Sequence, residues 1–225
     1  MGTYRIVNDG IWIPATPSSI YFFETSKNVI KENALIIDEN IHALARIKST
    51  LEEVMASGNE SNKIERIELL NDLIKFKYQY CFFLHFTMDF SINIRELILA
   101  PTRSEQLFYT KVIYIDLYRY LERHNADLGI IKKLSRTSDE YKEYHKSYLR
   151  FRDSHYQEIK DNRNLLYAHF DAKVQYDKYF NIAANLDAEV VAKMCRSFYE
   201  SHLRLSSIYV SIDNDFLNRV KILFN

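Results

Sequence analysis

The scarcity of glycine and proline restricts the fold of this chain more than any other sequence feature. Only 4 Gly and 3 Pro occur among 225 residues, whereas average usage would supply roughly 16 and 11. These residues form most tight turns and hairpin loops, so the chain has few positions for sharp reversals. A β-sandwich, a propeller or a many-stranded barrel is therefore disfavoured. We expect an all-α fold, a bundle of about five long helices joined by short polar loops.

Phosphate-binding loops are excluded by the same scarcity, because neither GxGxxG nor GxxxxGK[ST] occurs in the chain. No GxSxG nucleophile motif is present either. The two cysteines, Cys81 and Cys195, lie far apart on predicted helices and are interpreted as reduced core residues. We predict no cofactor and no metal site.

The charge balance limits which partners the chain can capture. Lys and Arg together number 30, as do Asp and Glu, so the formal net charge is zero. A protein that coats nucleic acid is normally basic, so only a small local contact with RNA remains open. Length and composition indicate one domain over residues 1–225.

Targeting and membrane segments are not expected. The N-terminal residues contain no apolar signal stretch. The most apolar stretch, Tyr78 to Ile94, is interrupted by polar side chains and does not predict a membrane span. We therefore expect a cytoplasmic protein with no membrane partner.

The spacing of apolar residues, together with the residues that end helices or form turns, divides the chain into segments. Residues 1–18 predict a small N-terminal β-hairpin that turns at Asp9-Gly10. Helices are predicted over about 26–56, 62–100, 102–124, 137–170 and 186–216, with a loop opening at Leu128-Gly129. Asn62 with Glu65, Thr102 with Glu105, and Thr137 with Glu140 are predicted to cap three of these helices. The predicted apolar stripe of the first helix consists of Ile37, Ile41, Leu44, Leu51 and Met55. His202 lies in the apolar seam of the last helix and is predicted to be a core histidine with a partner.

One segment carries candidate chemistry, at the end of the helix predicted to finish near residue 170. It reads Asp161-Asn-Arg-Asn-Leu-Leu-Tyr-Ala-His-Phe-Asp171, with five residues between Arg163 and His169. Arginine is permanently charged and binds phosphate oxygens through a planar fork. Histidine titrates near neutral pH and can take and return a proton.

This segment resembles the signature of the HEPN superfamily, in which an Arg followed by a polar residue is separated from a His by four to six intervening residues. The Arg163-Asn164 pair and the Ala-His-Phe-Asp run ending at Asp171 look most like the abortive-infection (AbiU-type) HEPN proteins. The likeness covers about 11 residues closely, and the helical order extends it loosely over residues 60–215. The first 60 residues are not covered.

The resemblance implies a helical homodimer and, in catalytic members, metal-independent cleavage of RNA at the dimer cleft. His169 would act as general base toward a ribose 2′-hydroxyl, Arg163 would hold the scissile phosphate, and Asn164 would orient the other groups. Such proteins belong to defence or toxin-antitoxin systems, so RNA and a cognate antitoxin or other protein are the implied partners. The supporting candidates are His155, Arg152, Asp161 and Asp171.

Two alternatives remain open at this point. The first is a non-catalytic HEPN-like module that binds a nucleotide, RNA or a protein. The second is an unrelated helical bundle, in which Arg163 pairs with Asp161 or Asp171 and His169 caps the helix C-terminus. Residues six apart on a helix differ by about 120° in direction. Arg163 and His169 therefore converge only if the helix end unwinds or a partner subunit completes the site.

Overall fold

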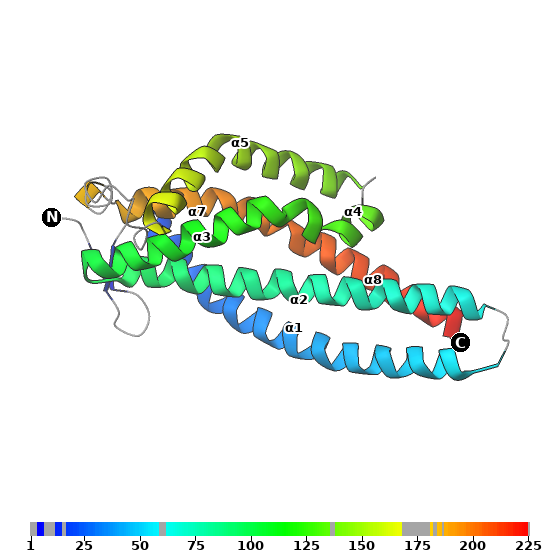
Figure 1. Ribbon diagram of the computed structural model, residues 1–225. Helices are drawn as coiled ribbons and strands as arrows, with labels where there is room; N and C mark the ends of the chain where they lie inside the picture. The colour runs from blue at the N-terminus through cyan, green and yellow to red at the C-terminus, as the bar shows by residue number, and fades with distance from the viewer. Residues whose placement is uncertain are drawn as a thin grey trace.

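The structure is a computed structural model, and it describes residues 4–6, 12–14, 17–58, 62–135, 138–167, 181, 184–185 and 187–224. Two long helices, α1 (Pro17–Ala56) and α2 (Lys63–Leu99), lie antiparallel along its length (Figure 1). Against them pack α3 (Arg103–Asp127), α7 (Ala188–His202) and α8 (Arg204–Phe224). The helix α5 (Asp139–Tyr167) lies on the outside, against α3 and α7. The predicted all-α bundle is confirmed.

Three helix predictions are wrong in detail. The first helix, α1, begins at Pro17 rather than near residue 26. The segment after Leu128 forms a short helix, α4 (Gly129–Ser135), where a loop was expected. The expected single last helix is interrupted at Leu203, which lies between α7 and α8. The Leu203 amide still donates to the Tyr199 carbonyl at 2.9 Å, and the Ser206 amide donates to the Leu203 carbonyl at 3.0 Å. A tighter i−3 bond at this point therefore separates the two helices.

Two short strands lie near the N-terminus. β1 (Tyr4–Ile6) pairs antiparallel with β2 (Trp12–Pro14), with Arg5 opposite Ile13. The turn predicted at Asp9-Gly10 lies outside the described residues.

The helix starts show which capping predictions hold. At α3 the predicted box is confirmed: the Glu105 amide donates to Thr102 Oγ1 at 3.2 Å, and the Thr102 amide donates to Glu105 Oε2 at 3.0 Å. At α5 the cap is Ser138, whose hydroxyl accepts from the Tyr141 amide at 3.1 Å; the predicted Thr137 lies outside the described residues. The prediction that Asn62 caps α2 with its side chain is wrong, since this residue has a left-handed φ of 74° and its side chain makes no capping hydrogen bond.

The buried stripe of α1 differs from the predicted one. Ile37 and Leu44 are buried, but Ile41 and Met55 are 54% and 60% exposed. Asn40 occupies an inward position instead. It can be buried because its side-chain amide donates a hydrogen bond to the Ile36 carbonyl at 2.9 Å. An inward polar residue breaks an apolar pattern that sequence periodicity alone would extend to Ile41.

The core of the bundle is rich in aromatic side chains. Phe76, Phe90, Tyr144, Tyr199 and Tyr209 are among its largest fully buried members. His202 is 1% exposed and hydrogen-bonded, so the prediction of a core histidine with a partner is confirmed. Both cysteines are free thiols, and Cys195 is completely buried.

Candidate functional site

The candidate site occupies the C-terminal half of α5, where the sequence places the Arg163-Asn164 pair. Between Asp139 and Tyr167 no glycine or proline interrupts the helix, and Ser138 caps its start. Arg163 and Asn164 therefore project from its last turns. His169 and Asp171 follow directly in the chain and lie outside the described residues.

Arg163 is held from two sides. Its Nη1 donates to Asn164 Oδ1 at 2.9 Å. Its guanidinium carbon lies 5.1 Å from the centre of the Tyr118 ring on α3, the geometry of a cation–π contact. The Arg163 side chain is half-buried and Asn164 is exposed. The two contacts restrict the orientation of the guanidinium at the edge of the bundle.

Tyr118 links Arg163 to a second tyrosine. The rings of Tyr118 and Tyr156 stack with their centres 6.3 Å apart. The Tyr156 hydroxyl donates to Glu122 Oε1 at 2.6 Å, and this hydrogen bond raises the pKa of Tyr156 to about 12. The tyrosine hydroxyl is therefore a stable donor near neutral pH. These contacts fasten α5 to α3 next to Arg163.

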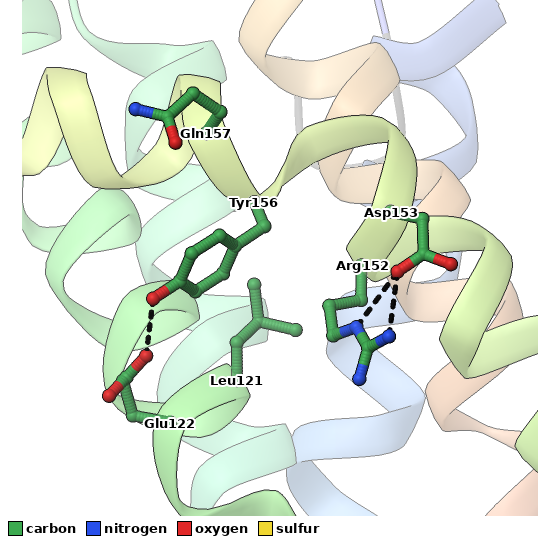
Figure 2. A pocket seen from close by; sticks show the side chains of 6 residues that line it. All are labelled: Leu121, Glu122, Arg152, Asp153, Tyr156 and Gln157. Carbon is green, nitrogen blue, oxygen red and sulfur yellow. Dashed lines mark hydrogen bonds and ion pairs between the residues drawn. The ribbon is translucent and has the colours of Figure 1, made fainter.

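A pocket of about 510 Å³ opens between α3 and α5 beside this pair of tyrosines. Figure 2 shows the Tyr156 hydroxyl directed at Glu122, and the Arg152 guanidinium directed at the carboxylate of Asp153. Arg152 donates to Asp153 Oδ1 from Nε and Nη2, at 2.9 and 2.8 Å. The remaining lining residues are Leu121 and Gln157.

The structure brings three of the predicted residues to this side of α5: Arg152, Arg163 and Asn164, the last of which accepts from Arg163. Arg152 and Arg163 are eleven residues apart, about three helical turns, so both lie on the same side of α5. Asp161 is exposed and accepts from the Gln157 amide at 2.9 Å, but its position nine residues after Arg152 puts it on the opposite side of α5. Arg152 and Arg163 therefore form a row along α5, and Asp161 does not belong to it.

His155 lies elsewhere. It lines a different pocket, between α5 and the α7–α8 pair, with its ring 4.9 Å from that of Phe151. Its Nδ1 lies 3.5 Å from Glu158 Oε2. His155, a supporting candidate for the Arg163 motif, therefore does not line the α3–α5 pocket.

Sequence reasoning missed three residues whose contacts surround the α3–α5 site: Tyr118, Glu122 and Tyr156. Tyr118 and Glu122 are four apart and share a face of α3. Tyr156 precedes Arg163 by seven residues, two turns of α5. Those spacings were visible, but nothing local to either helix indicates that α3 and α5 would be neighbours.

Comparison of this chain with protein-family models, characterised proteins and solved structures finds no significant match. Within the described ranges, no helix combines the length and apolar character that crossing a bilayer requires. Over the same residues, no three His, Cys, Asp or Glu side chains cluster as a metal site would need. The function of the α3–α5 site must therefore be inferred from its own side chains.

Proposed function

We propose that this protein is a HEPN-like, metal-independent endoribonuclease of a defence or toxin-antitoxin system. The observation that carries the proposal is the placement of Arg163, which is oriented by Asn164 and Tyr118 at the end of α5, six residues before His169. A guanidinium has five N–H donors in one plane. The bond to Asn164 sets that plane, and the planar fork of the guanidinium matches the oxygens of phosphate.

The proposed reaction uses the RNA's own nucleophile. The ribose 2′-oxygen attacks the adjacent phosphorus while His169 takes the hydroxyl proton. The bond from phosphorus to the 5′-oxygen breaks, and that oxygen takes up a proton as it leaves. The products are a 2′,3′-cyclic phosphate and a 5′-hydroxyl, so neither a metal nor external water enters the cleavage step. Arg163 would stabilise the negative charge that develops on the phosphate oxygens.

A homodimer is part of the proposal. Residues six apart on a regular helix point about 120° away from each other, so Arg163 needs a complementary His169 from the second subunit or an unwound helix end. A two-fold arrangement of the α5 ends would place two such pairs in one cleft. RNA and a cognate antitoxin would then compete for that cleft in the cytoplasm.

The decisive experiment incubates the purified protein with total RNA in EDTA and follows the products and their ends. We expect fragments that carry 2′,3′-cyclic phosphates, and no cleavage of a DNA of the same sequence. Arg163→Ala and His169→Ala should each lower the rate about 100-fold or more. Arg46→Ala is the matched control, because Arg46 is an exposed arginine of α1, far in sequence from the motif.

Three results would contradict the proposal. Cleavage that is unchanged in both motif variants would remove the motif from the reaction. Products with 5′-phosphates would exclude attack by the 2′-hydroxyl. RNA or nucleotide binding without any cleavage would instead identify the non-catalytic binding module.

A further inference from the structure

A second pocket, of about 310 Å³, lies between α5, α7 and the start of α8. Its lining includes two arginines from different helices, Arg150 on α5 and Arg204 on α8. Four serines also line it: Ser147, Ser154, Ser197 and Ser201. A small volume thus gathers two fixed positive charges and several hydroxyl groups.

The positive charge of this pocket is not neutralised within the described part of the chain. Neither Arg150 nor Arg204 makes an ion pair there, and both side chains are exposed. The carboxylate that lines the pocket, Glu200, is already bound by Arg196, whose Nε lies 2.8 Å from Glu200 Oε1. The pocket therefore favours an anion.

Ser201 supplies a separate indication of a ligand. The residue is only 5% exposed, and its hydroxyl oxygen has no hydrogen-bond partner among the described residues. Buried hydroxyl groups are nearly always hydrogen-bonded, because leaving one unpaired is unfavourable. The Ser201 oxygen exposes less than 1 Å², so among the described residues it is an unpaired donor in the pocket wall, which a bound oxygen would reach after a small side-chain adjustment.

We propose that this pocket binds a phosphate group, carried either by inorganic phosphate or by a small phosphomonoester. Guanidinium forks match the oxygens of phosphate, and serine hydroxyls donate to the same oxygens from other directions. The volume exceeds what a phosphate group alone fills and leaves space for a small organic group. His155 lines the same pocket and adds a third nitrogen-bearing side chain. The site lies on the α7 side of α5, away from the row of Arg152 and Arg163, and the inference does not depend on the proposed nuclease activity.

The test measures binding by calorimetry to the full chain. Inorganic phosphate, AMP and adenosine are titrated separately. We expect phosphate or AMP to bind and adenosine not to bind. AMP that binds more tightly than inorganic phosphate identifies the ligand as a phosphomonoester, and the reverse order identifies free phosphate.

Variants locate the binding. Arg150→Gln and Arg204→Gln should each raise the Kd for the phosphate ligand at least tenfold, and Ser201→Ala should raise it by a smaller factor. Arg46→Gln removes the same charge from an exposed helix position and should leave the Kd unchanged. Both arginines of the pocket are exposed, and circular dichroism will check that their variants remain folded.

Three outcomes would overturn the proposal: no heat of binding for phosphate or AMP at millimolar concentration, equal affinity in Arg150→Gln, Arg204→Gln and Arg46→Gln, or adenosine binding as tightly as AMP. Arg163→Ala distinguishes this site from the proposed nuclease, because it should lower the cleavage rate about 100-fold or more and leave the Kd for phosphate unchanged.

Discussion

Thr87 Oγ1 and His202 Nε2 lie 2.8 Å apart in the core of the bundle, and the direction of their hydrogen bond can be deduced. Thr87 uses its single proton to donate to the Phe83 carbonyl at 2.7 Å. Its oxygen can therefore only accept from His202, so Nε2 carries a proton. The ring stacks on Phe83 with 4.5 Å between centres, which fixes its plane.

The opposite nitrogen of the same ring completes the network. In the neutral ring His202 Nδ1 is then an acceptor, and the Tyr120 hydroxyl lies 3.0 Å away to donate to it. The Tyr144 hydroxyl is 3.2 Å from that of Tyr120, and burial raises the pKa of Tyr144 well above its usual value, which keeps this hydroxyl protonated. Both ring nitrogens of His202 are therefore hydrogen-bonded to side chains of α2 and α3, and these bonds hold α7 against the two helices.

Thr87→Val tests this network. Valine keeps the shape of threonine but leaves the Nε2 proton of His202 without an acceptor, which should lower the free energy of unfolding by about 1–3 kcal/mol. Thr25→Val is the matched control, because Thr25 also donates to the carbonyl four residues earlier, at 2.6 Å, and has no side-chain partner among the described residues. Urea denaturation measures both. Equal losses in the two variants would contradict a bond from His202 to Thr87.

Lys77 and Asp213 form the most enclosed ion pair in the described residues, at 2.7 Å with side chains 10% and 24% exposed. Lys77→Met would leave the Asp213 carboxylate unpaired in a confined site, which should cost up to about 3 kcal/mol. Lys133→Met breaks a pair with Asp72 whose lysine is 64% exposed, and should cost about 0–1 kcal/mol. Chemical denaturation measures the free energy of unfolding of both variants. Similar losses would show that the enclosed Lys77–Asp213 pair contributes no more to stability than the exposed Lys133–Asp72 pair.

Asp116 should give the stability of the protein a pH dependence. Burial is the main cause that raises its pKa from 3.8 to about 6; Asp89 raises it further, and Arg119 and the Asn93 amide lower it. The folded protein holds this proton more tightly than the unfolded chain, so the Asp116 contribution to stability is greatest below about pH 4 and is lost as the pH rises through 6.

Asp116→Asn removes the titrating group and preserves an oxygen that accepts from Asn93. Above pH 6 the variant should be more stable than the natural protein by about 1–2 kcal/mol after solvent screening, and the difference should vanish below about pH 4. Thermal unfolding over this pH range measures the difference. Asp215→Asn, at an exposed position of α8, is the control and should show no such pH-dependent gain.

Predictions that depend on residues close together in the sequence were correct more often than those that depend on tertiary packing. The α3 cap involves Thr102 and Glu105, three residues apart, and was predicted correctly because its two bonds close within one turn. Asn62 has the right residue type for a cap, but its backbone is left-handed, with φ 74°, and its side chain makes no capping bond. The prediction that Ile41 is buried was wrong, because Asn40 takes the inward position and its amide donates to the Ile36 carbonyl.

The candidate site divides in the same way. Arg163 and Asn164 are adjacent in sequence, so a sequence motif could identify them as a pair before their hydrogen bond was seen. The Tyr118 ring that carries Arg163 belongs to another helix, 45 residues earlier, and only tertiary packing brings it there. The phosphate pocket likewise combines Arg150 with Arg204, which no sequence pattern associates.

Tyr118 supplies the last prediction, which rests on the proposed nuclease function. If its ring orients Arg163, Tyr118→Phe should retain cleavage, because the phenyl face still carries the guanidinium 5.1 Å away. Tyr118→Leu removes that face and should lower kcat roughly 3- to 10-fold, the size of a partly exposed cation–π contact. A structural role for Tyr118 alone would lower the melting temperature without changing kcat per folded molecule. Single-turnover cleavage at a temperature where both variants are folded separates these effects, and equal kcat values for the two variants would show that Tyr118 does not position Arg163.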